Sequence, residues 1–264
     1  KDSHPKFALD NLAVDKEDLL SHAWFTIALY GEKEQEEKFF KQLEESAREN
    51  PVVRIQAAAE YMAGFLKRAF TSEKGTSGDM WCFMVATMAG ISVAEAAKET
   101  DKEQMVINLG NPLYMPLTKV DTKMGVFWIG DSLNKYIFNS PLSVWNIVMT
   151  LYSQKHKNAK LPDLKSFIDA NTKLMGDPKA RVWDGKHNPY NEIKDANNTY
   201  EKLRRRLEPY KLKKDEYPSV FAMALGIVIL KVEDIFPKNL NCLEISMQTM
   251  MFFAHMDVES SFLL

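Results

Sequence analysis

The chain has 264 residues, of which 34 are basic and 36 acidic, a formal net charge of -2, and a hydrophobic fraction of 45%. This composition is typical of a folded protein and excludes a strongly charged disordered chain. The near balance of charge supplies no overall field that would attract nucleic acid or an anionic surface. We expect a mainly α fold in which residues 1–264 form a single globular domain of about ten helices.

Neither a membrane-spanning helix nor a secretory signal is predicted. The longest uncharged apolar runs, 80–94 and 220–230, are shorter than the roughly 18 to 20 residues that cross a bilayer. The first residues are polar and lead into no apolar segment, although the chain does not begin with Met and a removed leader stays open. Two distant cysteines, Cys82 and Cys242, have no CxxC spacing and suit a reducing compartment, so we expect a cytoplasmic protein.

Helix signals are dense in the first seventy residues. Asp15 is placed to cap a helix that Gly31 ends. The segment 32–49 is rich in charge around a narrow apolar stripe, which predicts a helix with one buried face. Asn50 followed by Pro51 is a helix-opening pair, and it predicts a helix over 52–70 that is apolar over most of its circumference and therefore central.

The next segment begins with a polar stretch, 71–78, that has the composition of a loop. Asp79 is then placed to begin a helix that ends at Gly90. The pairs Ser92 with Glu95 and Thr100 with Glu103 match the spacing of the capping box, in which a hydroxyl and a carboxylate satisfy opposite amides at a helix start. Two further short helices are therefore predicted.

Residues 105–130 have the weakest helical pattern. The runs 106–109 and 113–115 flank Gly-Asn-Pro and fit a short hairpin, while 126–129 lies between two glycines and fits a strand. Short apolar runs fit a buried helix equally well, so a small β insertion here and a helix remain alternatives.

Helical periodicity resumes after Ser140, and Leu161-Pro162 opens a further helix that Gly176 ends. The stretch 175–189 contains two prolines and two glycines and is a candidate loop or subdomain boundary. The last third predicts helices over 190–207, 218–235 and 241–258. The final one is apolar nearly all round, so it is either buried in its own domain or covered by a partner.

The common catalytic and ligand-binding motifs are absent from the sequence. There is no GxxxxGK[ST] or GxGxxG run for nucleotide phosphates, and the five histidines form no HExxH or ExxH pair. Asp18 and His22 stand four residues apart, which an ordinary surface pair explains. We therefore expect neither a metal site nor a cofactor.

One enzymatic hypothesis centres on Cys82. If Asp79 caps its helix, Cys82 lies in the first turn, where unpaired amides and the helix dipole favour the thiolate. His187 is the candidate base, and Asp195 or Asn188 would orient it, which is the arrangement of a thiol-dependent hydrolase or transferase. The alternative is a buried structural cysteine, because Cys82 lies between Trp81 and Phe83.

A basic run distinguishes residues 202–214, where seven bases oppose Glu208 alone. It fits an acidic protein partner or a solvated helix end. Three consecutive arginines point in different directions round a helix, and Tyr210 is the one aromatic residue in the run, which argues against nucleic acid.

The favoured function is a non-enzymatic helical interaction protein: an adaptor, a chaperone-like factor or a subunit of an assembly. The periodicity does not distinguish a monomer from an oligomer. The residues expected to contact a partner are Arg204, Arg205, Arg206, Lys211, Lys213 and Lys214, with Met247, Met250 and Met251 of the last helix.

Overall fold

The computed structural model describes residues 33–69, 71–72, 75–76, 78–122, 125–157, 161–174, 189–235 and 242–257. The helix expected between Asp15 and Gly31 lies outside these residues, and so does nearly all of the predicted boundary at 175–189.

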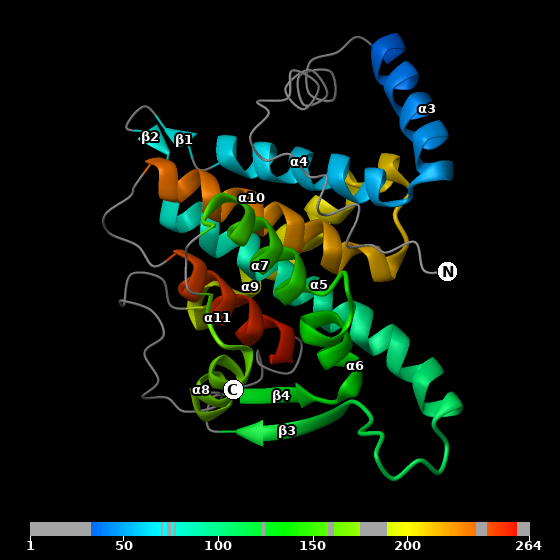
Figure 1. The fold of residues 1–264 in the computed structure, drawn as a ribbon, viewed down its shortest axis with the longest axis vertical. Helices are drawn as coiled ribbons and strands as arrows, with labels where there is room; N and C mark the ends of the chain where they lie inside the picture. Colours follow the sequence, from blue (N-terminus) through cyan, green and yellow to red (C-terminus); the bar gives the residue numbers. More distant parts are fainter. Residues whose placement is uncertain are drawn as a thin grey trace.

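The described chain is mainly helical, which confirms the predicted fold class (Figure 1). Eight helices of 11 residues or more lie within the described residues, slightly fewer than the ten expected from the sequence. Their bounds are α3 (Lys33–Glu49), α4 (Val52–Ala69), α5 (Gly78–Ile107), α7 (Val144–Lys155), α8 (Leu164–Leu174), α9 (Pro189–Arg206), α10 (Tyr217–Ile235) and α11 (Cys242–His255).

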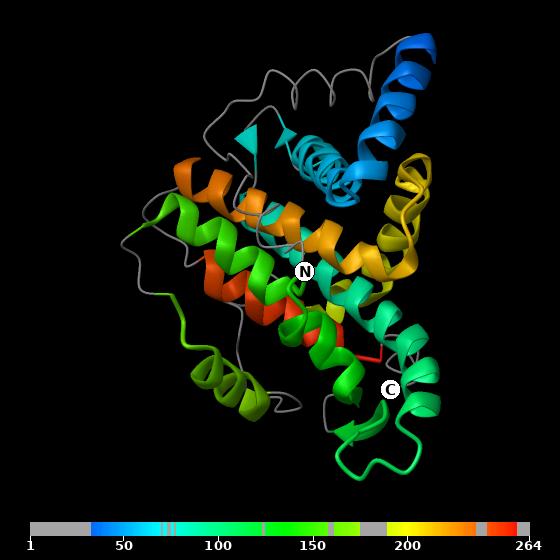
Figure 2. The same ribbon diagram turned by 45° about the vertical axis from the view of Figure 1, so that its right-hand side comes forward.

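Two helices, α5 and α10, organise the core (Figures 1 and 2). Helix α10 packs against α4, α5 and α7, and α11 packs along α5 and, to a smaller extent, against α10. Both central helices are apolar round most of their surface, because they are covered on several sides. By length and composition α5 alone among the described helices is apolar enough to cross a membrane, but most of that window is buried in the fold, as in any core helix.

The predicted break at Gly90 is wrong, because α5 continues without interruption for 30 residues. Gly90 allows α11 to approach α5 closely. A Cβ added at this position would lie 2.5 Å from the Met250 carbonyl oxygen of α11. The two expected capping boxes are also wrong. Ser92 donates its hydroxyl to the Ala89 carbonyl, and the Thr100 hydroxyl pairs with that of Tyr136 at 2.6 Å, so both residues lie inside the helix.

A small antiparallel hairpin, β3 (Thr118–Thr122) and β4 (Gly125–Ile129), confirms the predicted β insertion. The strand at 126–129 is where the sequence placed it, but the expected hairpin over 106–115 is wrong. Residues 106 and 107 end α5, and 108–117 form an irregular loop. A two-residue pair, β1 (Thr71–Ser72) and β2 (Gly75–Thr76), stands in the stretch expected to be a loop.

The end of α11 fixes the β3–β4 hairpin to the core. The Asp257 amide donates to the Val126 carbonyl at 2.8 Å, and His255 Nδ1 lies 2.8 Å from the Trp128 carbonyl oxygen. Lys119 reaches the Asp257 carboxylate at 2.6 Å. The short helix α6 (Asp131–Asn134) and the π-helical turn η1 (Lys135–Asn139) then lead from the hairpin into α7.

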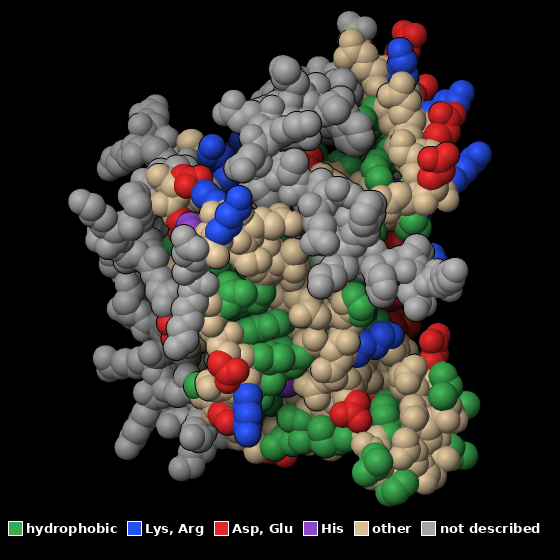
Figure 3. Space-filling view, in the orientation of Figure 1, with side chains coloured by type: hydrophobic (Ala, Val, Ile, Leu, Met, Phe, Trp, Pro, Cys, Tyr) green, Lys and Arg blue, Asp and Glu red, His purple; other side chains and the backbone are tan. Residues whose placement is uncertain are grey.

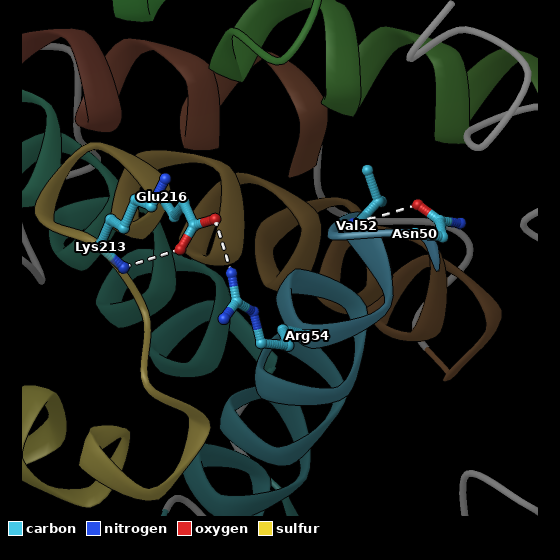
Figure 4. A network of polar contacts seen from close by, with 5 residues as sticks. All are labelled: Asn50, Val52, Arg54, Lys213 and Glu216. Atoms are coloured by element: carbon cyan, nitrogen blue, oxygen red, sulfur yellow. Dashed lines mark hydrogen bonds and ion pairs between the residues drawn. The ribbon is translucent and has the colours of Figure 1, made fainter. Parts of the chain in front are cut away.

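Local capping fixes several helix starts. Asn50 Oδ1 accepts the Val52 amide at 3.1 Å, as its sequence position predicts (Figure 4). Helix α7 is capped by Ser143, and α8 is preceded by Asp163, whose carboxylate accepts the Ser166 amide at 2.9 Å.

Candidate functional site

The thiol at Cys82 does not have the surroundings of a nucleophile. It lies on α5 with 5% of its surface exposed, and because the helix begins at Gly78, it is past the first turn. Its pKa is raised well above the ordinary value, first by a hydrogen bond with Cys242 of α11 and then by burial. Both effects favour the neutral thiol, so the structure supports the buried structural cysteine.

The proposed partners of Cys82 are not brought to it within the described residues. His187 and Asn188 lie outside them, and so does the side chain of Asp195, although its backbone is part of α9. What the fold does bring together is Cys82 and Cys242, two free cysteines from distant parts of the chain. Sequence spacing contained no signal for this pairing.

The methionines of α11 belong to the core. Met247 and Met250 have no exposed surface and Met251 has 2%, so the expected partner contact at these residues is replaced by packing inside the chain. Of the two alternatives for this apolar helix, burial within its own domain holds. The physical reason is that α11 packs along α5 and receives the β3–β4 hairpin over its end.

The basic run does not form one continuous surface. Arg204 donates to Glu201 at 2.9 Å, Lys211 to Glu44 of α3 at 3.0 Å, and Lys214 to Glu99 of α5 at 2.9 Å. Lys211 and Lys214 therefore link neighbouring elements, Arg204 is paired within α9, and all three cations already have a carboxylate partner. Exposed pairs of this kind contribute little to the free energy of folding.

Lys213 also has a local structural role through its backbone. Its amide donates to Glu216 Oε2 at 2.7 Å, while Arg54 of α4 approaches Glu216 Oε1 at 3.4 Å (Figure 4). The Arg54–Glu216 contact joins α4 to the 3-10 turn that directly precedes α10. Of the six basic residues expected to bind a partner, three have their side-chain cation paired within the fold, and Lys213 takes part through its backbone amide.

Arg205 and Arg206 lie instead along an open groove, together with Lys202. These three residues stand at positions i, i+3 and i+4 of α9, which places them on one side of the helix. None of them forms an ion pair with another described residue. We call this feature the basic groove; it has a volume of about 590 Å³ and is lined by Phe65, Leu66, Met84, Thr199, Lys202, Leu203, Arg205 and Arg206.

The floor of the basic groove is apolar. Phe65 and Leu66 come from α4 and Met84 from α5, and the Arg206 guanidinium lies 4.5 Å from the centre of the Phe65 ring. This cation–π contact holds the guanidinium over the floor while leaving its donors available. The sequence contains one signal for this grouping, the helical spacing of Lys202 to Arg205 and Arg206, which separates these three residues from Arg204.

A second hollow, of about 450 Å³, lies between α3, α4 and the 3-10 turn η2 (Glu208–Tyr210). Its wall carries both signs of charge, including the Lys211–Glu44 pair, so it has no preference for an anion or a cation. Tyr210 forms its buried side, and burial raises the pKa of that phenol. This hollow offers no ligand-selecting chemistry.

A different surface stands at the end of α5, where the helix and the loop after it project from the body (Figure 1). Five large apolar side chains there are at least half exposed, and Figure 3 shows hydrophobic atoms on this projection. We call it the apolar tip; its residues are Met105, Val106, Ile107, Leu109 and Leu113. Its sequence signal was the absence of any charged residue between Met105 and Thr118.

Among the described residues, no group of three or more His, Cys, Asp and Glu side chains is arranged to hold a metal ion. Comparisons of the chain with protein-family models, curated proteins and solved structures find no match. The basic groove and the apolar tip are therefore the features from which a function can be argued.

Proposed function

We propose that this chain is a non-enzymatic helical interaction protein, an adaptor, chaperone-like factor or subunit of a larger assembly, that binds an acidic protein partner. The observation that carries the proposal is the basic groove, where three cations without an ion pair to any described residue line one side of an apolar floor. The buried Cys82 supports this function over a thiol hydrolase, because a shielded neutral thiol cannot attack a substrate.

The chemistry of the groove favours a carboxylate-bearing segment that also has an apolar side chain. Arg205 and Arg206 can each bind a carboxylate through two parallel hydrogen bonds. The apolar floor at Phe65, in the same groove, accepts an apolar group of the same partner segment. Three like charges on one face of α9 repel one another in the free protein. A partner that neutralises them removes this repulsion when it binds.

A reducing compartment, the cytoplasm, is part of the proposal. Cys82 and Cys242 are neighbours in the core and remain free thiols, which is the usual state of cysteine where glutathione keeps thiols reduced.

The test is purification of the tagged full chain from its own cells, followed by mass spectrometry, for the wild type and the double variant Arg205→Glu/Arg206→Glu. We expect the wild type to retain a stoichiometric partner with an acidic surface, and the variant to lose it while its circular dichroism stays unchanged. Because the contact is ionic, raising the salt concentration should also release the partner from the wild type.

The matched control is Lys38→Glu/Arg48→Glu, which makes the same change of charge at exposed positions of α3. This control should keep the partner. The proposal fails if Arg205→Glu/Arg206→Glu keeps the partner as the wild type does, or if both double variants lose it equally.

A further inference from the structure

The apolar tip exposes more hydrophobic surface than any other described part of the chain. Leu109 is 90% exposed, Leu113 88%, Val106 76% and Ile107 73%. Contiguous exposed apolar side chains of this kind mark a contact site with a protein or a membrane. The tip lies apart from the basic groove, which is built from α4, α9 and the first half of α5.

Hydrogen bonds to a buried carboxylate hold the tip in place. Asp101 is 7% exposed, and its Oδ1 accepts the Tyr114 hydroxyl at 2.7 Å and the Leu117 amide at 3.0 Å. Ser132 of α6 donates to the same oxygen at 2.8 Å. The chain that returns from the tip is therefore tied to α5 and α6, and the exposed side chains project from a fixed base.

Part of the backbone of the turn within the tip is hydrogen-bonded. The Asn108 amide donates to the Gln104 carbonyl and the Asn111 amide to the Asn108 carbonyl, both at 2.9 Å. Asn111 Oδ1 accepts the Leu113 amide at 3.0 Å, and the Tyr114 amide donates to the Asn111 carbonyl. These four paired amides lower the cost of bringing the turn into an apolar medium, because each unpaired group would cost several kcal/mol there.

The size and composition of the tip favour lipid over protein as its occupant. A standard protein interface uses about 20 to 30 residues on each side, whereas the segment that carries the tip, 105–113, has nine residues in all. The five side chains of the tip are aliphatic, and the Trp, Tyr and Arg anchors typical of protein interfaces are missing from them. Acyl chains can surround a convex projection of this size, and aliphatic side chains partition favourably into them.

We propose that the apolar tip inserts into the surface of a phospholipid membrane, with Leu109 and Leu113 among the acyl chains. The exposed charges at its base are mixed, with Lys102 next to Glu103 and Lys119 on the same strand as Asp121. The inserted segment itself carries no charge. Binding therefore takes place on a neutral membrane and is insensitive to salt.

The test is flotation of the full chain with phosphatidylcholine vesicles. The wild type is expected to float with the vesicles at low and high salt, and Leu109→Ser/Leu113→Ser to lose roughly tenfold in partition coefficient for each leucine, about 100-fold in all. Because both side chains are almost fully exposed, the variant keeps the fold, which circular dichroism checks.

Two control variants separate the roles of the surfaces. Leu109→Met/Leu113→Met keeps the apolar character and should float like the wild type, and Arg205→Glu/Arg206→Glu should float unchanged because the basic groove is elsewhere. The proposal is overturned if the wild type does not float, or if the serine variant floats equally well. It is also overturned if sedimentation velocity without lipid shows a wild-type dimer that the serine variant abolishes, since a second copy would then occupy the tip. None of these outcomes alters the partner test at the basic groove.

Discussion

Gly90 offers the sharpest test of how the core is packed. It lies in the middle of α5, and a Cβ added there would be 2.5 Å from the Met250 carbonyl oxygen, 2.7 Å from Phe253 Cβ and 2.9 Å from the Ala254 amide nitrogen. Two of these atoms are backbone, and the third is fixed to it, so no change of rotamer can relieve the contact. Gly90→Ala must therefore push α11 away from α5.

The expected loss of stability is a difference between two effects. Alanine in place of glycine inside a helix gains about 1 kcal/mol of helix propensity. Overpacking a core costs about 1 to 3 kcal/mol, and the upper end applies because the clash is with backbone along the most extensive helix contact of the fold. The net destabilisation is then about 2 kcal/mol, which lowers the Tm of a chain of this size by roughly 4 to 8 °C.

Gly226 in α10 is the matched control. A Cβ there would lie 2.5 Å from Leu151 Cδ1 and 3.3 Å from Leu151 Cβ, so the closest atom is the end of a flexible side chain. Gly226→Ala is therefore expected to stay within about 1 kcal/mol of the wild type, because the helix-propensity gain offsets a small repacking cost. Urea unfolding followed by circular dichroism measures both variants. The reasoning is refuted if Gly90→Ala is as stable as the wild type, or if the two variants lose the same free energy.

Two further predictions concern buried titratable groups. Cys82 should resist iodoacetamide in the folded chain and react only in denaturant, because burial and the hydrogen bond with Cys242 raise its pKa; rapid labelling of the folded chain, detected by peptide mass spectrometry, would contradict this. Burial lowers the pKa of His255 despite its hydrogen bond to the Trp128 carbonyl, so below the ordinary histidine pKa of about 6.5 the unfolded chain binds more protons than the folded one. The stability that depends on neutral His255 is therefore present above that pH and is lost as the pH falls through the lowered folded-state pKa. His255→Gln should flatten the decline in unfolding free energy between pH 7 and pH 5. An equal decline in the wild type and in the variant would contradict this role of His255.

Much of the fold was predictable because its signals are local. The stripe of Phe39, Leu43 and Ala47 on a charged segment is the buried face of α3, and the pair Asn50-Pro51 marks the start of α4. The apolar run from Tyr217 to Ile235 became the central helix α10. In each case neighbouring residues alone set the periodicity and the cap.

The candidate site was predicted only in part. Arg205 and Arg206 were named from the sequence, but Lys202 was grouped with bases that turn out to be paired elsewhere, and the groove floor at Phe65 and Met84 comes from helices far away in the chain. Whether a cation is paired depends on which carboxylate the fold places beside it. Nothing near Lys211 in the sequence indicates Glu44.

The sequence by itself therefore determined the helical class, the strand at 126–129 and the approximate bounds of most described helices, because propensity, periodicity and capping act over a few residues. Tertiary structure decided the rest. It made Gly90 a packing residue and not a helix end, buried the α11 methionines, placed Cys82 beside Cys242, and left the apolar tip exposed. These outcomes depend on which surfaces meet, and that is settled by the burial of helices against one another across the whole chain.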